Sequence, residues 1–136
     1  MNWIVVGIKW IMVVSGILTT TMIYAAINPE AALQSTFGET LEEPLAKIIV
    51  RNWGALIALI GLMVIYGAFR PAVRSLVLIV AGVSKAIFIA LVLSQGTRYL
   101  SQQAGEAVAI DAVMIVLFAW YLLASLTRRM VAVPGQ

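Results

Sequence analysis

The chain has 136 residues, of which 62% are hydrophobic and 11% are charged, and its formal net charge is +3. A water-soluble domain of this length could not bury so much apolar surface, whereas a bilayer accepts it as exposed area. The basic residues occur singly or in pairs and form no stripe, so we expect no nucleic-acid partner. The composition predicts a single transmembrane domain that spans residues 1–136, with membrane lipids as its surroundings.

Four apolar stretches are long enough to cross the hydrocarbon core, which needs about 20 residues of helix. They are residues 3–27, 45–69, 73–94 and 107–126. Backbone polar groups have no partner in lipid, so each stretch is predicted to be helical. The predicted fold is therefore an all-α, four-helix membrane bundle.

The first stretch also resembles the apolar part of a signal peptide. We expect it to be a retained span, since no basic residue precedes Lys9 and the bulky Tyr24 stands where cleavage needs a small residue.

The polar, acidic segment 28–44 separates the first two spans. Asn28, which precedes a proline, is a typical N-cap, and Gly38 is a typical end of the short helix that would follow. Thr40 and Glu43 have the spacing of a capping box for the second span. We therefore predict a short interfacial helix on the outer side of the membrane.

Arginines mark the opposite side of the predicted bundle. The turn between spans two and three and the C-terminal tail hold Arg70, Arg74, Arg128 and Arg129. Cytoplasmic loops carry an excess of basic residues, so both termini are predicted to be cytoplasmic.

Lys85 lies near the middle of span three, where a charge costs on the order of 3 kcal/mol. Asp111 in span four lies at a compatible depth, because a few residues of helix at about 1.5 Å each separate the two. Arg51 and Asn52 in span two lie at a similar outer depth. We predict that these four residues form a polar intramembrane cluster.

Three interpretations of this cluster stay open. It is a structural ion pair that fixes helix register, or a polar pocket for an ion, a proton or a small anionic ligand. Alternatively, it contacts lipid headgroups or a partner subunit. The sequence suggests no catalytic residue, no metal site and no cofactor, because it contains no cysteine and no histidine and shows no nucleophile–base pair.

Span three also has a row of small residues at four-residue spacing, which places them on one face of the helix. These are Gly82, Ala86, Ala90 and Ser94, and span two repeats the pattern with Gly54 and Ala58. Small residues let helix backbones approach closely in a membrane. We interpret both sets as helix-packing surfaces, within this bundle or against another subunit.

Several short motifs together are typical of one group of proteins. They are Asn28-Pro29, Phe37-Gly38, Arg51-Asn52-Trp53-Gly54 and the turn Arg70-Pro71. With these motifs the chain resembles the small four-helix bacterial membrane proteins grouped with the DoxX-like proteins. The resemblance implies a four-helix bundle in the bacterial cytoplasmic (inner) membrane and no established activity.

Two functions remain compatible with the sequence. The first is a non-catalytic accessory or scaffolding subunit, packed against other membrane subunits or against its own copies. The second is an oligomeric transporter or channel that uses Lys85, Asp111 and Arg51. Four helices alone enclose a narrow lumen, so we expect the second function to require symmetry-related copies.

Overall fold

The computed structural model describes the backbone of residues 2–132 and the side chains of residues 6–128. Helices make up nearly all of it, in the order α1 (Asn2–Thr20), α2 (Ile23–Ile27), α3 (Pro29–Phe37), α4 (Pro44–Phe69), α5 (Pro71–Leu93) and α6 (Gln103–Ala132). The described residues contain no strand. The all-α prediction is confirmed.

Four segments are long and apolar enough to cross a membrane: Val6–Ile27, Pro44–Phe69, Pro71–Leu93 and Gln103–Arg128. Large apolar side chains on their outer faces stay exposed, as Leu76 (64%) and Val116 (67%) do. Such surfaces are stable against lipid and costly in water. The protein is a membrane protein with four transmembrane-capable helices.

The fourth predicted span corresponds to α6, which extends beyond the predicted bounds of 107–126 at both ends. Hydropathy marks the part of a helix that lies in hydrocarbon, whereas hydrogen bonding continues into the polar flanks.

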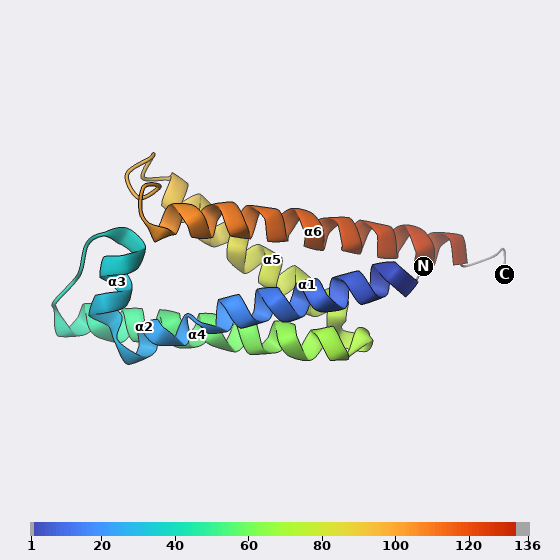
Figure 1. Cartoon of the computed structure of the whole chain (residues 1–136), viewed down its shortest axis with the longest axis horizontal. Coiled ribbons are helices and arrows are strands. Elements are labelled where there is room, and N and C mark those ends of the chain that lie inside the picture. Colours follow the sequence, from blue (N-terminus) through green and yellow to red (C-terminus); the bar gives the residue numbers. More distant parts are fainter. Residues whose placement is uncertain (1, 133–136) are drawn as a thin grey trace.

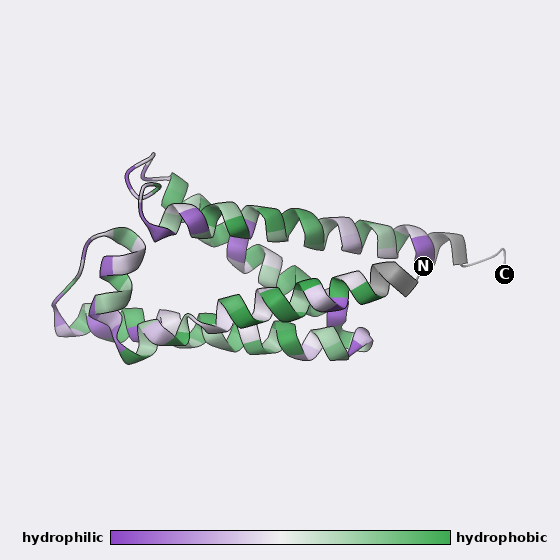
Figure 2. Ribbon diagram, viewed as in Figure 1, coloured by the Kyte–Doolittle hydropathy of each residue, from purple (hydrophilic) through white to green (hydrophobic). Residues whose placement is uncertain are grey.

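The start of α1 and the end of α6 lie at one end of the bundle, and α3 lies at the other (Figure 1). Helix α1 packs along α4 and α5 packs along α6, whereas α1 and α6 contact each other only briefly. Hydrophilic residues gather at the two ends, and a few interrupt the apolar lengths of α5 and α6 (Figure 2). We call the end with α3 the outer end, following the predicted orientation.

The first span is interrupted at Thr21 and Met22, between α1 and α2. The Met22 amide donates to the Thr19 carbonyl at 3.2 Å, a tighter turn than an α-helix makes. Threonine hydroxyls that bond back to the helix bend it, and Thr19 and Thr20 both do so, to Ser15 and Gly16 carbonyls at 2.8 and 2.6 Å. The first span is therefore a broken helix.

The α1–α4 contact depends on glycine. A Cβ on Gly61 would lie 2.5 Å from the Thr20 nitrogen and 2.7 Å from the Gly16 oxygen. The predicted small residues Gly54 and Ala58 are buried in α4, where a Cβ on Gly54 would lie 2.7 Å from the Ala26 nitrogen. The two backbones approach this closely because no side chain stands between them.

The inner half of the bundle has a closely packed apolar core to which all four spans contribute. Met12, Val64, Leu78 and Phe118 are its largest fully buried side chains, each at most 1% exposed.

Arg74 has a different place from the one the sequence suggested. The sequence places it in the turn between spans two and three, but it lies in the first turn of α5 (Pro71–Leu93) and is only 3% exposed. Its Nη2 donates to the Ala68 carbonyl at 2.7 Å and its Nε to the Gly67 carbonyl at 3.3 Å. The guanidinium thus caps the last carbonyls of α4, and the Gly67 carbonyl also accepts from the Arg70 amide at 3.3 Å.

The predicted short helix is α3. The Asn28 Oδ1 accepts a hydrogen bond from the Ala31 amide at 3.2 Å, and Gly38 ends the helix with φ +74°. The predicted capping box of α4 is wrong, since Glu43 is itself the N-cap and makes no side-chain cap hydrogen bond. Because Pro44 occupies the first helical position, the cap falls on Glu43 and not on Thr40.

Candidate functional site

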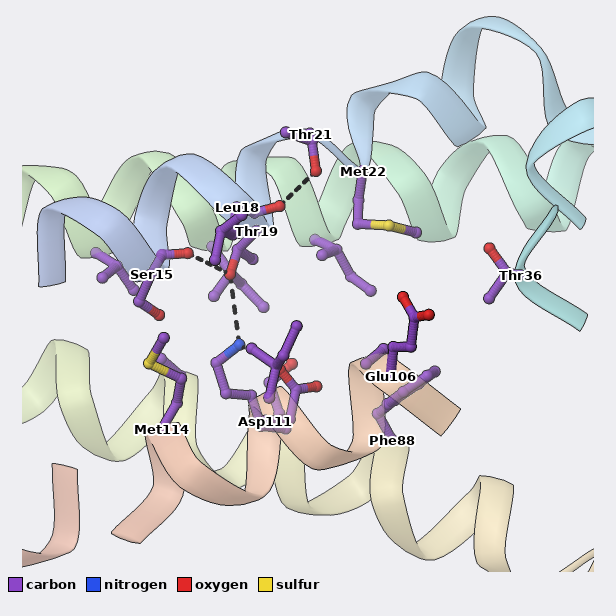
Figure 3. Close-up of a pocket in the computed structure, with 18 of the residues that line it drawn as sticks. Ser15, Leu18, Thr19, Thr21, Met22, Thr36, Phe88, Glu106, Asp111 and Met114 are labelled. Carbon is purple, nitrogen blue, oxygen red and sulfur yellow. Dashed lines mark hydrogen bonds and ion pairs between the residues drawn. The ribbon is translucent and has the colours of Figure 1, made fainter. Parts of the chain in front are cut away.

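A cavity of about 270 Å³ lies inside the outer half of the bundle, between α1, α4, α5 and α6. Its inner end lies near Ser15 and Met114, and its outer end lies near Thr36 and Glu106 (Figure 3). A cavity of this size within a helix bundle is a typical place for a small ligand.

The wall that α4 contributes is apolar. It consists of Trp53, Ile57, Ile60 and Val64, whose spacing places them on one face of the helix. The polar lining comes from the other helices, so the cavity has an apolar side and a polar side.

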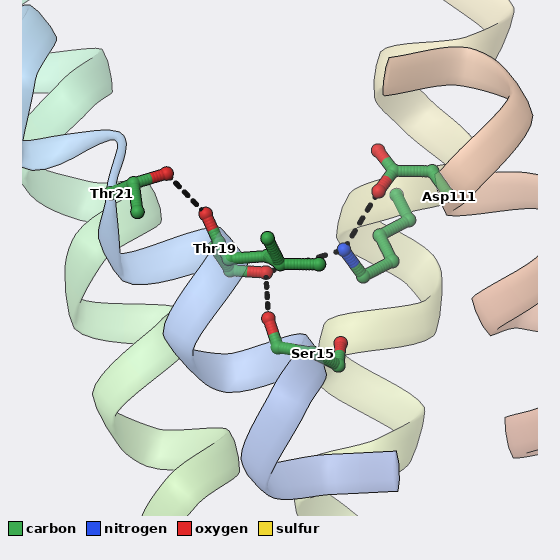
Figure 4. Close-up of polar contacts among 6 residues, drawn as sticks. Ser15, Thr19, Thr21 and Asp111 are labelled. Carbon is green, nitrogen blue, oxygen red and sulfur yellow. Dashed lines mark hydrogen bonds and ion pairs between the residues drawn. The ribbon is translucent and has the colours of Figure 1, made fainter. Parts of the chain in front are cut away.

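Lys85 and Asp111 meet on the polar side. The Lys85 Nζ donates to Asp111 Oδ1 at 2.8 Å and to the Thr19 hydroxyl at 3.4 Å (Figure 4). Their side chains are 11% and 17% exposed, and both line the cavity. The structure thus joins α5 to α6 by an ion pair and α5 to α1 by a hydrogen bond, at the depth that sequence reasoning assigned to the pair.

Arg51 and Asn52 do not join this cluster. Both are exposed, and neither lines the cavity. The Arg51 Nη1 donates instead to the Ala26 carbonyl at 3.0 Å, at the end of α2. Depth in the membrane was the basis of the prediction, but rotation about the axis of α4 turns these two residues away from α5 and α6.

Ser15 has an unusual hydroxyl. The residue is 1% exposed and lines the inner end of the cavity, yet its Oγ has no hydrogen-bond partner among the described residues. Its side chain points from α1 toward α5, on the same side as the Lys85 ammonium (Figure 4). A buried hydroxyl without a partner costs about 1–3 kcal/mol, so this position has hydrogen-bonding capacity that the chain itself does not use.

Glu106 stands at the outer end of the cavity. Its carboxylate points from α6 across the cavity toward Met22 (Figure 3). None of the salt bridges found among the described residues includes it. Glu106 is exposed, and in the sequence a single glutamate near a helix start gives no signal of a cavity.

At the outer end, polar and aromatic contacts join the end of α3 to the turn before α6. We call these contacts the clasp. Glu39, after α3, pairs with Arg98 in the turn before α6, and the Phe37 ring lies edge-on to Tyr99 at 5.3 Å. Hydrogen bonding with the Tyr99 hydroxyl, and then with Arg98, lowers the pKa of Glu39. Phe37 also lies 6.3 Å from Trp53, so the clasp contacts the cavity wall directly.

The small-residue row of α5 faces outward. Ala86, Ala90 and Ser94 are exposed, and a Cβ on Gly82 would meet no atom within 4 Å. Among the described residues the row is largely uncovered, and its role as a packing surface stays a prediction.

The described residues contain no group of three metal-ligating side chains. Comparisons with family models, with curated proteins and with solved structures found no match. The DoxX-like resemblance stays a prediction, and the cavity is the feature of the chain that points to a function.

Proposed function

We propose that the protein is a small-solute transporter whose binding site is the cavity that Lys85 and Asp111 line. The observation that carries the proposal is the ion pair itself. Charged residues within membrane spans are costly, and they mark substrate and ion pathways when they face an interior cavity. An ion pair that only fixed helix register would need no cavity beside it.

Two further features support transport over binding alone. The apolar core around Met12 and Leu78 borders the cavity, since Val64 and Ala81 belong to the core and line the cavity. The break between α1 and α2 lies beside the cavity, since Thr21 and Met22 line it. Broken helices at a binding site are typical of transporters that alternate between two open states. The cavity is lined by residues of a single chain, which supports a binding site within one copy.

Cysteine labelling tests this proposal, because the chain has no cysteine of its own. Ser84 lines the cavity, and Ser84→Cys introduces one thiol there with little change in volume. We expect a membrane-impermeant thiol reagent to react with it from either side, in right-side-out and in inside-out vesicles. Leu62→Cys, on the exposed face of α4, is the control and should not react, since a thiol in lipid stays protonated.

Reaction of Ser84→Cys from the outer side alone would overturn transport and leave a binding protein. Reaction from neither side would overturn the binding site as well.

The exposed small-residue row favours a second candidate, an accessory subunit that packs α5 against another membrane protein. In that case Ala86→Phe should remove the chain from its complex on a native gel after mild-detergent extraction, while Leu62→Phe on α4 should not. Unchanged migration of Ala86→Phe would count against this candidate.

A further inference from the structure

The charges around the cavity do not cancel. Lys85 and Asp111 neutralise each other at 2.8 Å, and Glu106 adds a second carboxylate that pairs with no described residue. Three ionisable side chains therefore give the cavity an excess of one negative charge. A net negative charge at a site attracts cationic ligands. The sequence left an ion, a proton or a small anionic ligand open for the polar cluster, but the Lys85 ammonium already has a carboxylate partner.

Glu106 is exposed at the outer end of the cavity, and aromatic and apolar side chains line the cavity that it borders. Trp53 on α4 and Phe88 on α5 are among them, and Phe88 lies toward the same end as Glu106 (Figure 3). Aromatic faces attract organic cations. The site suits a cation that also has an apolar body, which would lie along the α4 wall.

Between α1 and α6, residues that line the cavity also reach the surface of the bundle. Leu18 on α1 and Ile110 on α6 line the cavity and are 47% and 45% exposed. Both lie within membrane-spanning segments, so this side of the cavity faces lipid. Glu106 lies four residues closer to the outer end than Ile110. A molecule with its charge at the interface and its apolar part in hydrocarbon matches this arrangement.

Ser15 indicates which chemical group of a ligand would bind at the inner end of the cavity. Its buried Oγ lacks a partner, so a ligand that reaches it gains by presenting a hydrogen-bonding group there. Ser15 lies near Met114, which is eight residues from Glu106 along α6, or about 12 Å at 1.5 Å per residue.

We infer that the ligand is an amphipathic organic cation, which binds with its charged group at Glu106 and a hydrogen-bonding group near Ser15. The inference rests on the proposed function and names the chemical class that the cavity takes. Its three parts are the unpaired carboxylate, the apolar and aromatic walls, and the buried hydroxyl without a partner.

The test measures protection of the Ser84→Cys thiol from N-ethylmaleimide, a neutral reagent, in protein reconstituted into nanodiscs. The probes are octyltrimethylammonium and octanesulfonate, which share a chain and differ in charge. We expect the cation to slow the reaction and the anion not to. Glu106→Gln should raise the cation concentration needed for protection at least tenfold. Glu42→Gln, which removes an exposed outer-loop carboxylate, should leave that concentration unchanged.

The Ser15 part is tested with ω-hydroxyoctyltrimethylammonium. We expect this probe to protect at lower concentration than octyltrimethylammonium, and Ser15→Ala to remove the difference. Equal protection by the two probes in the unchanged Ser15 background would overturn this part.

Protection by octanesulfonate at equal or lower concentration, or unchanged protection in Glu106→Gln, would overturn the cationic class and leave the binding site in place. A thiol that reacts but is protected by neither probe would also overturn that class. A thiol that does not react at all would overturn the proposed function itself. These outcomes separate the two proposals.

Discussion

Lys85 and Asp111, which are 26 residues apart in the chain, hold α5 to α6 through one contact of 2.8 Å between Nζ and Oδ1. The same Nζ reaches Thr19 on α1, so one ammonium links three of the four spans. Because the two side chains are only 11% and 17% exposed, removal of either leaves the other with little solvent to stabilise its charge.

Substitutions in this pair should affect the free energy of unfolding and transport differently. We expect Lys85→Met to lower the free energy of unfolding by about 3 kcal/mol, since it leaves a carboxylate without its partner in an apolar bundle. The double variant Lys85→Met with Asp111→Leu should recover most of that loss, because two apolar side chains of similar volume need no partner. Denaturant titration of the purified protein in mixed micelles measures both.

The same double variant should still fail in transport. If it recovered stability and also retained transport, the pair would be structural only.

Arg74 should matter far more than its neighbour Arg70. We expect Arg74→Ala to cost about 3 kcal/mol of unfolding free energy, because two carbonyls at the end of α4 lose a charged donor in a buried place. Arg70 is exposed, and Arg70→Ala should change stability by no more than about 0.5 kcal/mol. Equal effects of the two substitutions would contradict the capping role of Arg74.

The glycines of α4 and α5 should respond oppositely to one added methyl group. Gly61→Ala should destabilise by about 2 kcal/mol, because the new Cβ meets the backbone of α1 at 2.5 Å and neither helix can yield locally. Gly82→Ala meets nothing within 4 Å and should stabilise by about 0.5 kcal/mol through helix propensity. Thermal unfolding of the two variants in one detergent gives the comparison. A loss of stability in Gly82→Ala would show that another helix covers this face.

Acid should loosen the outer clasp. The pKa of Glu39 lies below its ordinary 4.5 because of Tyr99 and Arg98. A carboxylate with a lowered folded-state pKa contributes stability that is present above its unfolded pKa and is lost as pH falls through the folded value. We therefore expect amide exchange in residues 94–102 to quicken, relative to its intrinsic rate, once pH drops below about 4.

Glu39→Gln should remove the Glu39 part of that pH dependence and loosen the clasp at neutral pH. The pKa of Glu30 is also lowered, by Lys47, and its titration stays in this variant as an internal comparison. Identical pH profiles in the two proteins would show that Glu39 does not hold the clasp.

The sequence by itself determined the four spans, the short helix between Asn28 and Gly38, and the depth match of Lys85 with Asp111. These features depend on local quantities. Hydropathy sets which residues lie in hydrocarbon, backbone hydrogen bonding requires helices there, and the cap chemistry of Asn28 and Gly38 acts over one turn. Depth along parallel axes follows from counting residues.

Only the tertiary structure decided which helix face meets which neighbour. Rotation about the helix axis turns Arg51 and Asn52 away from Lys85, buries Arg74 under the end of α4, and brings the Gly61 backbone against α1. The same rotations enclose Ser15 and the apolar face of α4 around one cavity, while the small-residue row of α5 faces outward. A four-residue spacing says that residues share a face, but the packing of whole helices, summed over many weak contacts, fixes where that face points.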